Sequence, residues 1–111
     1  MTKIKRNLNK LNQLKTLLVA SPEDSFLLFA IAKEYEKMEN WEMTIQWLEQ
    51  LRKQDMDYGG LYYHLAFAYS EIEDTSTALT ICDLGIDILE NQKDIHLLKE
   101  LQNLKLNISF Q

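Results

Sequence analysis

The chain has 111 residues, of which 46% are hydrophobic and 26% charged, which is an ordinary composition for one globular domain. It has no apolar run near the roughly 20 residues of a membrane-spanning helix, and its N-terminus lacks the apolar core of a secretory signal. The single cysteine, Cys82, excludes an internal disulfide framework and favours a reducing compartment, so we expect a cytoplasmic protein.

The net charge of −5 is unevenly distributed along the chain. Residues 1–20 hold five basic residues and no acid, whereas residues 21–111 hold seven basic and seventeen acidic residues. An acidic body repels phosphates, so we expect no nucleic-acid partner. The basic segment could bind a membrane surface, because its cations lie opposite a leucine stripe. We favour docking of this segment on the acidic body.

Apolar residues at helical spacing predict six helices and no strand. The first helix covers about residues 3–20 and ends at Ser21–Pro22, because a residue before proline avoids the helical conformation. We expect Asn40 and Asp74 to cap the starts of later helices, and Asn91 to provide a left-handed stop. The remaining predicted helices cover about residues 24–38, 41–54, 61–72, 75–90 and 94–108.

The apolar spacing in the second predicted helix recurs 34 residues later in the fourth. The first copy is Leu28, Ile31, Ala32 and Tyr35, and the second is Tyr62, Leu65, Ala66 and Tyr69. A pair of short helices cannot bury its apolar face alone, whereas stacked pairs bury a shared one. The repeat therefore predicts a stack of helix pairs.

This arrangement resembles the tetratricopeptide repeat family. The family pattern reads as Leu28, Ile31, Ala32, Tyr35, Thr44, Leu48 and Met56 in one copy, and as Tyr62, Leu65, Ala66, Tyr69, Ala78, Cys82 and Glu90 in the next. Upstream, Leu11, Leu14, Leu17, Leu18 and Pro22 match the second helix of a preceding repeat, so the resemblance covers about residues 8–90. The sequence departs from the family pattern, because alanine replaces glycine twice and the closing proline is absent after both copies.

The resemblance implies an all-α, right-handed superhelix of antiparallel helix pairs, in a single domain covering residues 1–111. A half-repeat would cover residues 1–22, two repeats residues 25–58 and 59–92, and a capping helix residues 93–111. We predict a cap because a third copy would place polar residues in the core. Those polar residues are His96, Lys99, Glu100 and Asn103, whereas the apolar set is Leu97, Leu98, Leu101, Leu104 and Ile108.

The first helix of each repeat carries more aromatic and apolar residues than stacking requires. Similar proteins line a concave groove with these positions, so the resemblance implies a non-catalytic adaptor that binds a peptide or a partner helix. The candidate groove residues are Phe26, Phe29, Lys33, Lys37, Tyr63, His64, Phe67 and Glu71. Alternatively, Phe29, Tyr63 and Phe67 only pack between repeats. Some relatives clamp a peptide carboxylate with Lys and Asn pairs, but only Lys33 matches that pattern, so we expect no clamp.

No set of residues predicts a metal site, a cofactor site or an enzyme. His64 and His96 lack metal-ligand spacing to each other and to Cys82. Two alternatives to the adaptor remain. One is a self-associating structural unit, in which the same aromatic residues or Trp47 form a homodimer. The other is a peripheral membrane adaptor that uses the basic N-terminal helix.

Overall fold

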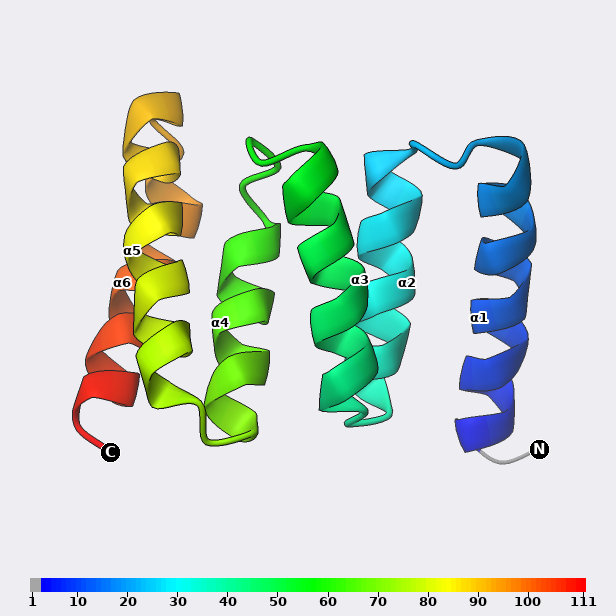
Figure 1. Ribbon diagram of the computed structural model, residues 1–111, viewed down its shortest axis with the longest axis horizontal. Helices are drawn as coiled ribbons and strands as arrows, with labels where there is room; N and C mark the ends of the chain where they lie inside the picture. Colours follow the sequence, from blue (N-terminus) through cyan, green and yellow to red (C-terminus); the bar gives the residue numbers. More distant parts are fainter. Residues whose placement is uncertain (1–2) are drawn as a thin grey trace.

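The computed structural model describes residues 3–111, and all regular secondary structure within this range is helical. The helices are α1 (Lys3–Ala20), α2 (Ser25–Lys37), α3 (Trp41–Gln54), α4 (Leu61–Glu71), α5 (Thr75–Gln92) and α6 (Ile95–Ser109). Consecutive helices are antiparallel and follow one another along the longest axis, from α1 to α5 and α6 (Figure 1). The predicted all-α array of paired helices is confirmed. None of the described helices is both long and apolar enough to cross a bilayer.

The same tight turn ends α2, α4 and α5. In each turn, a residue with left-handed backbone precedes an Asn or Asp whose side chain caps the next helix. The left-handed residues are Glu39 (φ 56°), Glu73 (φ 64°) and Lys93 (φ 59°). The N-caps that follow are Asn40, Asp74 and Asp94, each of which accepts a hydrogen bond from a backbone N–H three residues later.

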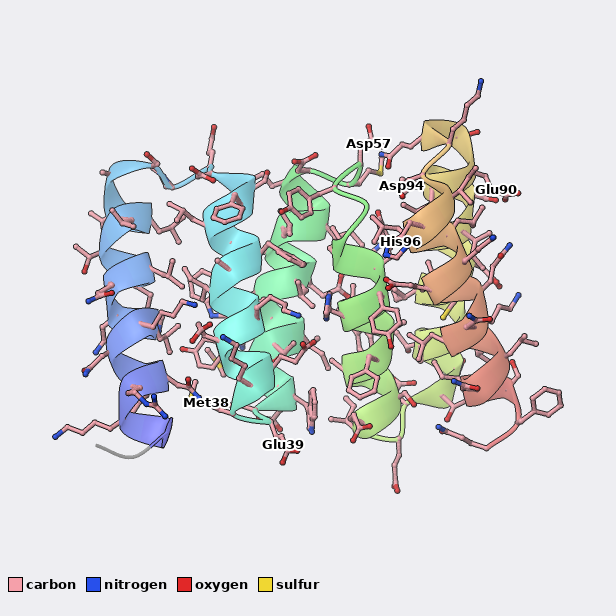
Figure 2. All side chains as sticks on the ribbon, turned by 180° about the vertical axis from the view of Figure 1, so that it is seen from behind. Met38, Glu39, Asp57, Glu90, Asp94 and His96 are labelled. Carbon is pink, nitrogen blue, oxygen red and sulfur yellow. The ribbon has the colours of Figure 1, made fainter. Side chains whose placement is uncertain are left out.

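The predicted caps at Asn40 and Asp74 are confirmed, but the predicted stop at Asn91 is wrong. Helix α5 continues to Gln92, and Lys93 adopts the left-handed conformation. The reason is the position of Asp94, whose N–H donates to the carbonyl oxygen of Leu89 at 3.1 Å, as Asn40 does to Tyr35. In Figure 2 the turn with Glu39 lies at the opposite edge of the array from Asp57 and Asp94.

The core consists of the repeated positions. The family-pattern residues of α2 and α4 are buried, except Tyr69, which is partly buried, and so are those of α3 and α5 that face them. The hydroxyl of buried Thr44 donates to the carbonyl oxygen of Asn40 at 2.8 Å, so its polar group is satisfied. Gly85 on α5 lies so close to α4 and α6 that a Cβ there would come within 2.5 Å of Tyr62 and 2.6 Å of Leu101.

The two ends of the array also follow the sequence pattern. In α6, Leu101, Leu104 and Ile108 are buried, whereas the polar residues that a third copy would bury are exposed. In α1, Leu11 is buried against Ile31 of α2. Helix α1 is therefore docked on α2 through Leu11, with Leu14 and Leu18 packed partly against the same cluster, whereas Leu8 is 45% exposed.

Candidate functional site

A continuous series of aromatic rings runs along α2 and α4. Successive ring centroids lie 5.2–6.4 Å apart, in the tilted, edge-to-face or offset-stacked arrangements that aromatic pairs favour. In order, the rings belong to Tyr58, Phe29, His64, Tyr63, Phe67 and Trp41. All six side chains are partly exposed. Phe29, Tyr63 and Phe67 thus pack against neighbouring rings and still present part of their surface to solvent.

A charged network joins α2 to α4 beside these rings. Nδ1 of His64 donates to Oε2 of Glu36 at 2.7 Å, because a carboxylate can only accept. On its other side, the ring places Nε2 3.4 Å from Nζ of Lys33, which also donates to Oε1 of Glu36 at 3.2 Å. Burial would raise the pKa of Glu36, but the hydrogen bond from His64 and the charges of His64 and Lys33 outweigh it and lower that pKa.

The rings lead into a groove between α4 and α6 with a volume of about 480 Å³. Its lining consists of Tyr63, His64, Glu100, Asn103, Leu104 and Asn107. Leu104 is almost fully buried and forms an apolar floor, whereas the three polar residues of α6 are exposed and form a wall. Two of the predicted groove residues therefore meet a wall that the repeat pattern did not include.

The other predicted residues lie nearer the edges of this surface. Phe26, at the start of α2, is 66% exposed. Nζ of Lys37 contacts the buried carboxylate of Glu34 at 3.0 Å, and the same carboxylate contacts Lys10 of α1, so Lys37 leans toward α1. Glu71 is the exposed last residue of α4.

Two hollows elsewhere have slightly larger volumes, about 580 and 560 Å³. The first lies on α3, where Nε of Arg52 already contacts Oε1 of Glu49 at 2.7 Å. The second lies at the C-terminal end of α6, beside Ile86 and Leu106. Neither hollow includes a predicted groove residue or a ring of the series, although the second shares Asn103 with the groove between α4 and α6. We therefore take the groove between α4 and α6 as the candidate site.

Repeat analysis of the sequence missed several residues of this surface. Tyr58 and Trp41 lie just outside α4 and at the start of α3, so the pattern of the first helices did not include them. Glu36 could have been found from its spacing of three residues after Lys33. The α6 wall could have been found from Asn103 and Asn107, which are one helical turn apart on the polar side of the predicted cap.

The reactivity of the remaining candidate groups is low. Cys82 is fully buried, and burial, with a smaller effect of Asp83, raises the pKa of its thiol to about 11. Within residues 3–111, no cluster of His, Cys, Asp and Glu side chains has the arrangement to hold a metal ion. The distinctive chemistry of the surface is thus aromatic and amide contact.

No protein-family model and no curated protein matches the sequence. Among solved structures, the chain is similar to a tetratricopeptide repeat domain protein from Salinibacter ruber, with 32% identity and a TM-score of 0.73. This match covers 78% of the present chain and 97% of the other.

Two further structures are similar in fold alone. One is the TPR2B domain in the TPR2B-domain:pHsp70 complex of yeast Sti1, with a TM-score of 0.88, 16% identity, and coverage of 95% of this chain and 84% of that one. The other is SycD, a type III secretion translocator chaperone of Yersinia enterocolitica, with a TM-score of 0.86, 13% identity, and coverage of 96% and 74%.

Proposed function

The chain belongs to the tetratricopeptide repeat family, and on this premise we propose that it is a non-catalytic protein-interaction adaptor. Its ligand is a peptide or a partner helix, held on the surface formed by α2, α4 and α6. The proposed repeats cover residues 25–58 and 59–92, between a half-repeat over residues 1–22 and a cap over residues 93–111. The cytoplasm is the proposed location.

The observation that carries this proposal is the series of six partly exposed rings. A ring offers a large contact area and has few rotatable bonds, so its immobilisation on binding costs little entropy. Packing between the repeats already fixes these rings in part, through contacts such as Phe29 with His64 and Trp41 with Phe67. A surface that is fixed before binding loses less conformational entropy than a flexible one.

Within this surface we assign the centre to Phe29, Tyr63, His64 and Phe67, and the edges to Phe26, Lys33, Lys37 and Glu71. The complex named for yeast Sti1 pairs its domain with pHsp70. A carboxylate-ended tail is not the ligand we propose for the present chain. The reason is that the ammonium groups of Lys33 and Lys37 already contact Glu36 and Glu34.

The test exposes the immobilised full chain to a phage-displayed library of random peptides and measures the Kd of enriched peptides by fluorescence polarisation. Combined Tyr63→Ala and Phe67→Ala substitution should raise Kd about thirtyfold or more, as for other aromatic anchors. Because both rings also pack internally, a second variant, Asn103→Trp, obstructs the groove from its exposed wall. Leu84→Ala, at a 42% exposed residue of α5 outside the groove lining, is the control.

Circular dichroism checks that each variant retains its helices. Failure to enrich any peptide, or equal binding to wild type and to a folded Asn103→Trp variant, would contradict the proposal. Sedimentation of the free chain over a range of concentrations tests the alternative of a self-associating unit. A dimer that Asn103→Trp disrupts would assign the groove to self-association.

A further inference from the structure

The lining of the groove between α4 and α6 carries negative charge and no lysine or arginine. The charge is that of one carboxylate, Glu100. The side chain of Glu100 is 49% exposed, and its contact in the structure is His96 at 3.4 Å, whose own side chain is 84% exposed. An ion pair this exposed is worth little, so a ligand cation can replace His96 at small cost.

The cation that contacts His64, on the α4 side of the groove, is already engaged by other side chains. Lys33 lies between Glu36 and His64, and both carboxylate oxygens of Glu36 are engaged by this pair of residues. An anionic ligand would have to compete with Glu36 for the ammonium group. It would also meet the field of residues 21–111, which hold seventeen acids against seven bases. The groove therefore disfavours acidic segments.

The amides of the α6 wall suit an extended backbone. Asn103 and Asn107 are four residues apart on α6, so their side chains are roughly 6 Å apart along the groove. Alternate peptide groups of an extended chain repeat at about 6.6 Å, which is nearly the same spacing. Each carboxamide has both a donor and an acceptor, as a peptide group does. The floor, by contrast, is apolar and consists of the Tyr63 ring and Leu104.

We propose that this groove selects an extended protein segment that carries a Lys or Arg next to an aliphatic or aromatic residue. The apolar side chain packs on Tyr63 and Leu104, the cation contacts Glu100, and the backbone pairs with Asn103 and Asn107. The inference rests on the proposed function, since it specifies the ligand of the same surface.

The experiment uses the displayed peptides whose binding Asn103→Trp blocks. Lys and Arg should be enriched in these peptides over Asp and Glu. In resynthesised peptides, replacement of the basic residue by Glu should weaken binding to the wild-type chain about tenfold. Glu100→Gln should weaken binding of the basic peptide about threefold to fivefold, and should leave a version with Gln at that position unaffected.

Glu90→Gln is the matched control, because Glu90 is an exposed acid of α5 outside the groove lining, and its loss changes the net charge equally. Groove-bound peptides without an excess of basic residues would overturn the inference and leave the adaptor function intact. Equal effects of Glu100→Gln and Glu90→Gln would overturn the contact with Glu100. No groove binding, or a second copy of the chain as the occupant, would overturn both proposals.

Discussion

The contact of α2 with α1 and the contact of α4 with α3 are equivalent places in the array, but their polar groups differ. Tyr35 accepts a hydrogen bond at 2.7 Å from Nζ of Lys15 on α1. Tyr69, 34 residues later, donates one at 2.5 Å to Oε2 of Glu49 on α3, which is itself 34 residues after Lys15. A phenol both donates and accepts, so the same tyrosine position tolerates either charge on the preceding helix.

The neighbouring position differs more. Glu34 is 2% exposed and contacts Lys37 and Lys10, whereas its equivalent in α4 is the fully buried Ala68. The equivalents of the two lysines are Glu71 and Thr44, neither of which is a cation. The first interface thus contains a buried carboxylate that pairs with two lysines through Oε2 while its Oε1 has no hydrogen-bond partner, and the second interface is apolar at the same place. The repeat fixes where a side chain lies, and the local partners decide which chemistry is tolerated there.

The largest effect should come from transferring the first interface's charge to the second. Ala68→Glu buries a carboxylate without the two lysines that pair with Glu34, so we expect a loss of about 3 kcal/mol or more in the free energy of unfolding. Urea denaturation followed by circular dichroism measures it. Ala68→Leu, which adds volume without charge, separates overpacking from the electrostatic cost. Equal losses in the two variants would show that the missing cations are not the reason for the apolar residue.

Removing the charge of Glu34, which pairs with Lys10 and Lys37, should have a smaller effect on the free energy of unfolding. Glu34→Gln keeps the size of the side chain but removes its ion pairs, and should cost about 2 kcal/mol of unfolding free energy. The cost is limited because the side chains of Lys10 and Lys37, 58% and 47% exposed, can return to water. The same urea series, repeated at high salt, checks this. A loss as large as that of Ala68→Glu would contradict the comparison.

The smallest effects should come from the two tyrosine hydroxyls, at about 1 kcal/mol each. Tyr35→Phe should cost less than Tyr69→Phe, because Lys15 keeps its position over the ring at residue 35 and over Trp47. Urea unfolding at neutral pH compares the two variants. A larger loss in Tyr35→Phe would show that the hydroxyl outweighs the ring contacts in the first interface.

Alkaline pH distinguishes the second interface further. Burial, followed by the hydrogen bond to Glu49, raises the pKa of Tyr69 from its ordinary 10.0 to about 12. The stabilisation of the folded chain by the protonated Tyr69 hydroxyl is therefore complete below pH 10.0, and it is lost as pH rises through about 12. Tyr69→Phe should remove this part of the alkaline decline in stability. A decline that is unchanged in the variant would contradict the assigned hydrogen bond.

Most of the fold could be predicted from the sequence because burial recurs with the period of the helix and of the repeat. Leu28 and Tyr62, for example, occupy the same position in the two copies of the repeat, and each side chain is buried. The turn at Lys93 could not be predicted from residue type, since lysine has no preference for a left-handed backbone. The N-cap that follows, Asp94, decides the conformation there.

The candidate site could be predicted only in part. The rings of Phe29, Tyr63 and Phe67 follow from the repeat. The spacing of Lys33 and Glu36 on one helix can be seen in the sequence, but their contacts with His64 depend on side-chain conformations across two helices, which spacing does not specify. The α6 wall was outside the prediction because α6 does not follow the repeat, so its inward-facing residues could not be transferred from α2 and α4.

Gly85 shows how a residue behind the groove can control what enters it. Helices α4 and α6 form the two sides of the groove, and both touch α5 at this glycine, which has no side chain to separate them. The spacing between the two walls therefore depends on a buried residue behind the groove. A larger residue at position 85 would push α4 and α6 apart and so change the width of the groove. The size of the segment that fits there would then change, although Gly85 itself is not part of the groove lining.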